Sequence, residues 1–289
     1  DLGIFGLDNS GVLTVSDITN LLISNSPIAL TVEVEDAGGL TDDATITVSI
    51  TDPVLCSPIS TLACPDVIET LPFSLDFSTD AGGLGDKNDA GTGFTAVLEH
   101  SEARRAGDLP ISNANINGYE PSLLTLNTGS EQLEILSQAG ISFLDPPQSS
   151  NNNNQVNTLG IGLQNITNPI RITTTLIGII TGNNAAQAGI WFGYDEDNFV
   201  KLDVNNNNVE LRREVGGNSE NADQLQDTGT GASGQDVLLE LEIDPTNNTI
   251  AAFYTIGTGN RTQVGNATLA LPAVYLSGRN LTGVTGGVS

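Results

Sequence analysis

The chain has 289 residues, enough for one large domain or two smaller ones, and its 38% of hydrophobic residues can supply a packed core. It carries 35 Asp and Glu against 9 Lys and Arg, a formal net charge of −26. This charge excludes nucleic-acid binding as a default, because a protein that binds phosphates needs a basic surface. No stretch of apolar residues is long enough for membrane insertion, and a single His excludes most His-based catalysis.

Residues 1–52 alternate apolar and polar side chains, most regularly over Ile28–Glu35 and Ala44–Ile50. Such alternation predicts half-buried antiparallel strands, and Asp36-Ala-Gly-Gly39 is expected to form the turn between them. Two prolines then predict a linker over residues 53–58, because proline cannot join a central strand.

Cys56 and Cys64 lie close together in the sequence, without a Cys-x-x-Cys spacing or a partner His. The spacing favours a local disulfide over two free buried thiols. A disulfide implies an oxidising environment, so we expect an extracellular, cell-surface location.

Residues 59–289 contain many short strand-like runs separated by clusters of Gly, Asn, Asp and Ser. No amphipathic helix is evident, so this region predicts an antiparallel sandwich of two sheets. The expected strands are Leu71–Phe77, Phe94–Leu98, Gln132–Leu136, Thr158–Leu163, Arg171–Ile180, Ala188–Tyr194, Phe199–Val204, Asn208–Arg213, Val237–Ile243, Ile250–Tyr254 and Ala270–Leu276.

The first segment resembles the second half of a cadherin repeat, through Phe5–Asp8, Ser10–Val15, Leu30–Asp36 and Ala44–Asp52. The resemblance implies an incomplete Ig/cadherin-like sandwich over residues 1–52. In that family acidic residues at the repeat junctions bind calcium, and the matching positions here are Asp36 and Asp52.

Half a sandwich leaves unpaired strand edges and half a core. Two explanations stay open. The chain can be a piece cut from a longer array of repeats, or a neighbouring subunit can donate the missing strand and so build a filament or a surface layer.

The second segment resembles concanavalin A-like and laminin-G-type domains of bacterial surface adhesins. The similarity rests on Gln187–Leu202, which reads as a β-hairpin, and on Leu71–Phe77, Gly82–Phe94 and Gly118–Leu123. It implies a concanavalin-like antiparallel β-sandwich, or jelly roll, over residues 59–289. Members of this family often bind carbohydrate and rarely catalyse.

Two groups of polar residues are candidates for binding. Calcium prefers about six to eight oxygen ligands, and oxygen-bearing side chains gather at Asp80, Asp86, Asn88 and Asp89, where a solvated acidic loop is the alternative. For a glycan we expect contacts from an aromatic platform and planar polar groups, although Trp191 can equally lie in the core and the acidic residues can simply form a turn. These glycan candidates are Tyr119, Trp191, Tyr194, Asp195, Asp197 and Asn198.

An enzyme is not expected. Only 4% of the residues are aromatic, His100 lies in a polar stretch, and neither a Glu-x-Asp-x-x-Glu nor a Gly-x-Ser-x-Gly motif occurs. We therefore predict a non-enzymatic, carbohydrate-binding adhesion module stabilised by calcium. Its expected partners are glycans or another cell-surface ligand and neighbouring repeats or subunits. The filament or surface-layer subunit is one alternative, and an ancillary module of a glycosidase is another.

Overall fold

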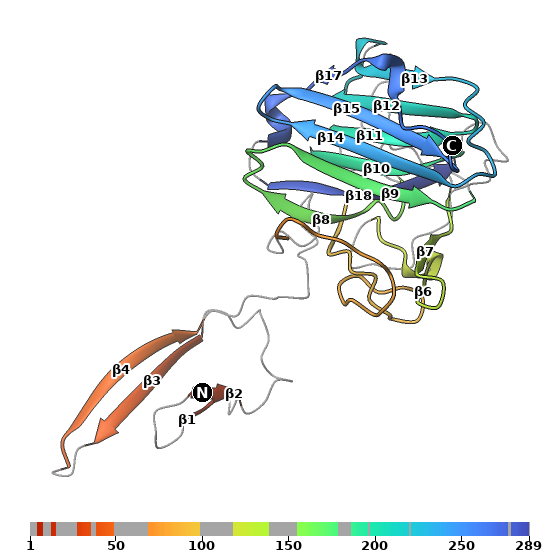
Figure 1. Cartoon of the computed structure of the whole chain (residues 1–289). Coiled ribbons are helices and arrows are strands. Elements are labelled where there is room, and N and C mark those ends of the chain that lie inside the picture. The colour runs from red at the N-terminus through yellow and green to blue at the C-terminus, as the bar shows by residue number, and fades with distance from the viewer. Residues whose placement is uncertain are drawn as a thin grey trace. The chain divides into compact units, whose positions relative to one another are not determined.

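The computed structural model divides the chain into two compact units, residues 1–55 and 56–289 (Figure 1). Its secondary structure is almost entirely antiparallel β-sheet, which confirms the predicted all-β class. None of the helices in the described part of the chain is long and apolar enough to cross a membrane. The described residues are 5–7, 13–15, 28–35, 39–48, 69–98, 118–138, 155–178, 186–195, 197–219, 221–276 and 279–288.

The described part of the N-terminal unit consists of two strand pairs. Strand β1 (Phe5–Leu7) pairs with β2 (Leu13–Val15), and β3 (Ile28–Glu35) pairs with β4 (Thr41–Val48). The alternating segments therefore form the antiparallel pair that their pattern predicts. Gly39 has a φ of +78°, a value that favours glycine, just before β4 begins.

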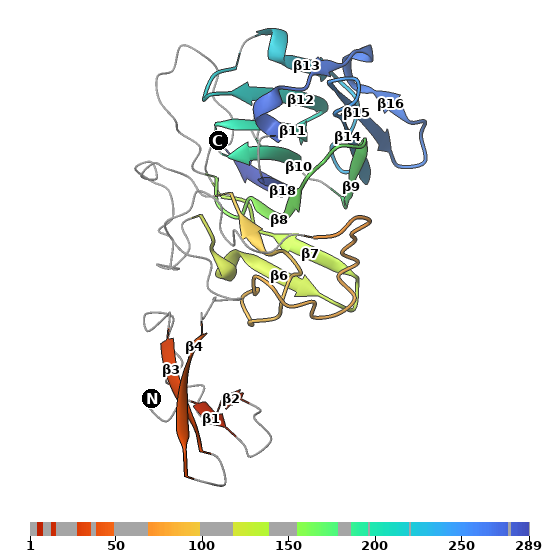
Figure 2. The ribbon, with the colours of Figure 1, turned by 90° about the vertical axis from the view of Figure 1, so that its left-hand side faces the viewer.

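The second unit is a sandwich whose two sheets face each other (Figure 2). The larger sheet has seven strands in the spatial order β13 (Gln224–Asp227), β12 (Asn208–Val215), β11 (Asn198–Asn205), β10 (Ala186–Asp195), β18 (Arg279–Val288), β8 (Leu159–Gln164) and β5 (Ala96–Val97). The smaller sheet has five, in the order β16 (Thr262–Gln263), β15 (Thr249–Ile256), β14 (Val237–Asp244) and β9 (Ile170–Leu176), with β17 (Leu269–Ala270) also on β15.

A separate hairpin of β6 (Leu124–Asn127) and β7 (Gln132–Ile135) follows a short 3-10 helix, η2 (Pro121–Leu123). The described residues also form the 3-10 helices η3 (Asn221–Asp223), η4 (Val264–Asn266) and η5 (Ala273–Leu276).

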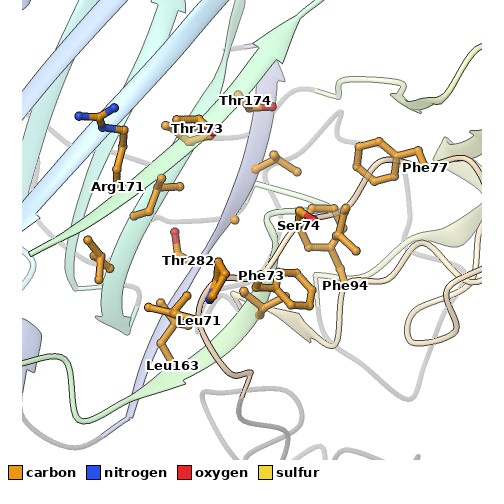
Figure 3. A pocket seen from close by; sticks show the side chains of 18 of the residues that line it. Leu71, Phe73, Ser74, Phe77, Phe94, Leu163, Arg171, Thr173, Thr174 and Thr282 are labelled. Atoms are coloured by element: carbon orange, nitrogen blue, oxygen red, sulfur yellow. The ribbon is translucent and has the colours of Figure 1, made fainter. Parts of the chain in front are cut away.

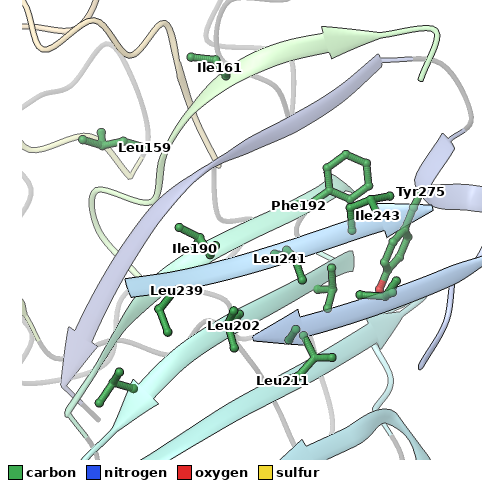
Figure 4. Packing of buried hydrophobic residues seen from close by; sticks show 14 of the residues in the cluster. Leu159, Ile161, Ile190, Phe192, Leu202, Leu211, Leu239, Leu241, Ile243 and Tyr275 are labelled. Atoms are coloured by element: carbon green, nitrogen blue, oxygen red, sulfur yellow. The ribbon is translucent and has the colours of Figure 1, made fainter. Parts of the chain in front are cut away.

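The core lies between the two sheets and follows from the alternation along each strand. Ile190 and Phe192 of β10 and Leu202 of β11 face Leu239 and Leu241 of β14, and all five are buried (Figure 4). Burying one such side chain contributes about 1.5–3 kcal/mol. Because these positions point inward, the residues between them on the same strands point to the outer faces of the sandwich.

The structure corrects two predicted strands. Leu71–Phe77 has no strand partner and instead runs past the end of the smaller sheet. Ala270–Leu276 contributes only Ala270 to a strand and then forms η5, which carries Tyr275 into the core. There the Tyr275 hydroxyl donates to the carbonyls of Phe199 and Glu214, so the ring joins two strands of the larger sheet.

Candidate functional site

The outer face of the larger sheet carries charged side chains that are almost completely buried. On β11, Val200, Leu202 and Val204 point into the core, so Lys201 and Asp203 point outward. Lys201 is 2% exposed and Asp203 0% exposed. Burying a charged group is costly unless the group is paired and hydrogen-bonded, so the partners of these buried charges have to be identified.

The strand register places like charges opposite each other. Asp203 of β11 faces Glu210 of β12, and Lys201 faces Arg212. Like charges in directly opposed positions are destabilising. The repulsion is offset along each strand, where Lys201 Nζ lies 3.2 Å from Asp203 Oδ2 and Arg212 Nε lies 2.6 Å from Glu210 Oε2.

The two carboxyl groups have different surroundings. Glu210 accepts hydrogen bonds from Arg212, from Gln226 Nε2 and from Asn205 Nδ2. Within the described residues neither oxygen of Asp203 accepts a well-directed hydrogen bond. Burial, together with the charge of Glu210, raises the pKa of Asp203 despite the opposing effect of Lys201.

Acid–base chemistry uses a carboxyl group whose pKa is raised beside a second carboxyl group, and the raised pKa of Asp203 next to Glu210 matches that arrangement. Two of the partners of Glu210 reach toward solvent, since Gln226 is exposed and the Arg212 side chain is 17% exposed. The sequence analysis missed this site. The sequence pattern that could have indicated the site is Lys201-Leu-Asp203 and Glu210-Leu-Arg212, in which charged residues alternate with apolar ones along two strands.

Trp191 belongs to the same outer face but is packed away from solvent. It is 1% exposed, clusters with Ala96 and Leu98, and donates its indole N–H to the carbonyl of Leu159 at 3.2 Å. The ring lies so close to Gly160 that a Cβ there would come within 3.0 Å of Trp191 Cζ2. The structure thus places Trp191 in a core-like position and not on an exposed platform.

Tyr119, another of the predicted glycan contacts, is also buried. Its hydroxyl donates to the carbonyl of Gly85 and so fixes the acidic loop to the rest of the sandwich. Burial, with the nearby charges of Asp89 and Asp86, raises the pKa of Tyr119 to about 12. This position gives Tyr119 a structural role in the loop.

The remaining predicted glycan contacts meet at the tip of the β10–β11 hairpin. Asp195 Oδ1 accepts from the backbone N–H of Asp197 at 3.0 Å and from Asn198 Nδ2 at 2.7 Å, while Asn198 Oδ1 accepts from Gly216 at 2.9 Å. Tyr194 precedes them and is half-buried. Partial burial and the charge of Asp195 raise the pKa of Asp197. These bonds make the tip a self-contained turn, the alternative that the sequence left open.

The predicted calcium loop is held by its own backbone. Asp86 Oδ1 accepts from the N–H groups of Asn88 and Ala90, and Asp86 Oδ2 accepts from Leu126. Asp80 Oδ1 accepts from Gly82 and Gly91. Burial raises the pKa of Asp86, but these hydrogen bonds outweigh it and leave the pKa below its usual value.

Both carboxylate oxygens of Asp86 and one of Asp80 therefore already accept N–H groups, and a calcium site in this loop stays a prediction. Asn88 and Asp89 are exposed, and no group of three His, Cys, Asp or Glu in the described ranges is placed to share a metal. The other predicted ligands and the predicted disulfide, Asp36, Asp52, Cys56 and Cys64, lie outside the described residues, as does His100.

No protein-family model and no curated protein sequence matches the chain. Solved structures do resemble it. They include the xyloglucan PUL protein GH43B from Bacteroides ovatus (12% identity, TM-score 0.45, 98% of this chain and 42% of that chain). A xylan β-1,4-xylosidase from Bacillus halodurans is similar at 14% identity and a TM-score of 0.44, over 97% of this chain and 55% of that chain. An endo-1,3-β-glucanase from Streptomyces sioyaensis follows at 11% identity and a TM-score of 0.39, over 76% of this chain and 87% of that chain.

These likenesses concern the fold alone, and the chain spans only 26% and 30% of the length of two further GH43 structures, from Bacillus licheniformis and a capybara gut metagenome. They nevertheless correct the expected function. The neighbours are glycoside hydrolases and include no cadherin or adhesin among those named here, so the prediction of a non-enzymatic adhesion module is wrong. The expected adhesin, cadherin and filament associations are withdrawn with it.

Proposed function

We propose that this chain is a carbohydrate-active β-sandwich that hydrolyses glycosidic bonds with Asp203 and Glu210. One observation carries the proposal. Two carboxyl groups oppose each other on neighbouring strands, and only Glu210 is held by a guanidinium while burial raises the pKa of Asp203. Glycoside hydrolysis needs two carboxyl groups whose environments separate their protonation states.

The two groups have distinct roles in the proposed reaction. Asp203, protonated, donates its proton to the glycosidic oxygen as the bond to the anomeric carbon breaks. Directly opposed strand residues have Cβ atoms about 5 Å apart, which suits the short carboxyl separation at which the second group acts as nucleophile. Glu210 then bonds the anomeric carbon, and a water molecule, deprotonated by Asp203, releases the sugar.

The substrate has to reach a buried pair, and the side of β13 offers the approach. Gln226 is exposed there and hydrogen-bonds Glu210, so its movement uncovers the carboxylate. Planar polar side chains continue outward from the pair in Gln224 and Asn208, both of which are half-buried. Amide and guanidinium groups of this kind can hydrogen-bond neighbouring sugar hydroxyls.

A second candidate function follows from the same burial. If Asp203 and Glu210 stay covered, the sandwich serves as a glycan-binding module within a glycoside hydrolase whose catalytic domain lies elsewhere. Hydrolysis by the isolated chain separates the two candidates, because only the first predicts it. An extracellular location remains part of the proposal for both, since polymeric glycans are too large to enter a cell.

The test compares Asp203→Asn and Glu210→Gln on natural and on activated substrates. Neighbouring structures suggest xylan and β-1,3-glucan as the polymers to try first. Loss of a general acid slows cleavage of the polymer by about 10²–10⁴-fold. The same loss slows cleavage of dinitrophenyl glycosides much less, because their leaving group needs no proton. Loss of the nucleophile slows both.

Glu242→Gln is the matched control for Glu210→Gln. Glu242 also pairs with an arginine, Arg171, at 2.9 Å, but lies on the smaller sheet. The proposal predicts normal hydrolysis by this control. Equal losses in all three variants, or hydrolysis that neither Asp203→Asn nor Glu210→Gln reduces, would refute the assignment.

A further inference from the structure

The two sheets of the sandwich differ in width, and the difference leaves a cavity at one edge. The smaller sheet ends at β9, whereas the larger sheet continues beyond β18 to β8 and β5. The inner face of β8 is therefore covered by the irregular segment Leu71–Phe77 in place of a strand. Between this segment, β9, β8 and β18 remains a cavity of about 560 Å³ that opens at the surface (Figure 3).

The floor of the cavity is apolar and buried. Ile161 and Leu163 of β8 and Ile190 of β10 are at most 6% exposed, and Phe94 is 5% exposed. Phe73 from the irregular segment completes one wall. Figure 3 shows these aromatic rings on one side and the β9 residues on the other.

The rim of the cavity contains hydroxyl groups and one arginine whose charge is paired. Ser74 is exposed on the irregular segment, and Thr174 of β9 and Thr282 of β18 line the inside. Arg171 is the charged residue of the lining, and its guanidinium is engaged by Glu242 at 2.9 Å and by Glu240 at 3.6 Å. With a net charge of −26 on the chain, an anionic ligand is repelled and the local arginine does not compensate.

We propose that this cavity binds a small, uncharged, amphipathic molecule with an aromatic or alicyclic body and a hydroxyl group. Its volume lies within the range of about 300–1,000 Å³ typical of ligand pockets, and an apolar wall with a few hydroxyls is the composition such pockets have. The apolar body lies against Phe73 and Phe94, and the hydroxyl meets Ser74 or Thr174 at the mouth.

The site is separate from the carboxylate pair. Ile190 lines the cavity on the inner face of β10, whereas its neighbour Trp191 lies on the outer face together with the charged residues. The inference therefore does not rest on glycan hydrolysis, and either can fail without the other.

Trp191, the only tryptophan, gives the binding experiment an internal reporter. The probe is N-phenyl-1-naphthylamine, a neutral aromatic amine whose fluorescence rises in apolar surroundings and which absorbs where tryptophan emits. The full chain is titrated with it. We expect saturable binding in the micromolar range. Trp191 emission should fall in parallel, because Trp191 follows Ile190, which lines the cavity.

Two neighbouring threonines supply a matched pair of variants. Thr174 lines the cavity, and Thr175 is exposed on the opposite face of β9. Thr174→Phe fills the space and is expected to weaken probe binding at least tenfold without lowering the melting temperature, whereas Thr175→Phe leaves binding unchanged. Ser74→Phe blocks the mouth from an exposed position without adding a second tryptophan, so it provides the same test if Thr174→Phe folds poorly.

Binding that does not saturate in the wild type would overturn the proposal. So would equal affinity in the wild type and in whichever of Thr174→Phe and Ser74→Phe is folded. A loss of binding in Thr175→Phe as large as that in Thr174→Phe would place the probe on the outer face and would also contradict it.

Discussion

Asp203 and Glu210 oppose each other across β11 and β12, yet Glu210 accepts from a guanidinium and from amide groups, whereas Asp203 has only its ion pair with Lys201 among the described residues. The difference arises from the order of charges along each strand. Arg212 follows two positions after Glu210 and reaches it with its guanidinium, while the ammonium of Lys201 also contacts Gln187. The two carboxyl groups therefore have different hydrogen-bond partners, and this asymmetry is the basis of the proposed function.

Because the pKa of Asp203 is raised, the free energy of unfolding should depend on pH through this residue. The pKa of Asp203 is higher in the folded protein than in the unfolded chain, where an Asp has a pKa of about 3.9. Protonation of Asp203 therefore stabilises the fold fully at a pH below the unfolded pKa. This contribution is lost as the pH rises through the folded pKa. Asp203→Asn removes the titration. The variant should therefore gain stability relative to the wild type between pH 4 and pH 7, as measured by urea unfolding.

The control for this experiment is Asp42→Asn, at an exposed position of β4 in the other unit. It should show no such change with pH. A stability difference between Asp203→Asn and the wild type that stays constant from pH 4 to pH 7 would mean that Asp203 titrates like an ordinary exposed carboxyl.

Gly283 should tolerate no side chain. It lies in β18 between β10 and β8, and a Cβ there would come within 1.8 Å of the carbonyl oxygen of Leu159. Gly283→Ala is expected to destabilise the sandwich by about 3 kcal/mol, because β18 joins both halves of the larger sheet. Gly129→Ala serves as control, since its nearest contact is the Asn127 side chain at 3.6 Å. Equal midpoints of denaturation for the two variants would contradict the account.

Tyr119 should contribute to stability and not to glycan recognition. Tyr119→Phe leaves the carbonyl of Gly85 without its hydroxyl donor, at a cost of about 1–2 kcal/mol near neutral pH. In the wild type the contribution of Tyr119 should be lost as the pH rises from about 10 to 12, because its folded pKa is raised to about 12. Weaker glycan binding with unchanged stability would restore the role that the sequence suggested.

The acidic loop is expected to need no metal. Because Asp86 accepts three backbone N–H groups, Asp86→Ala should cost about 2–4 kcal/mol. Adding EDTA or calcium should leave the melting temperature of the sandwich unchanged. A rise of several degrees with calcium that Asp86→Ala abolishes would show that the loop rearranges around an ion.

Local patterns predicted most of the strands because alternation reports which face is buried. The β10–β11 hairpin formed as Gln187–Leu202 suggested, with Ile190 paired to Leu202. Strand β18 escaped prediction because Thr282-Gly-Val-Thr-Gly-Gly reads as a loop. Gly283 is explained only by the close approach of the β8 backbone at Leu159 and Gly160, a contact between residues far apart in the sequence.

The candidate site was missed for a related reason. Asp203 and Glu210 fall within the predicted strands Phe199–Val204 and Asn208–Arg213, but a single sequence does not show which outer face becomes buried. The calcium prediction at Asp80 and Asp86 rests on oxygen-bearing side chains that the sequence shows, whereas the backbone N–H groups that these carboxylates accept appear only in the structure. The sandwich was predictable from local patterns, whereas the chemistry depends on register and burial.

The most direct test of the central claim is the release of reducing sugar from xylan and from β-1,3-glucan by the purified chain of 289 residues, beside its Asp203→Asn variant. The account predicts hydrolysis of at least one polymer by the wild type and a rate at least 100-fold lower in the variant, with circular dichroism showing that both are folded. Hydrolysis at equal rates would contradict the role of Asp203. Binding of a polymer without any hydrolysis by the wild type would reject catalysis by this pair and leave the glycan-binding module.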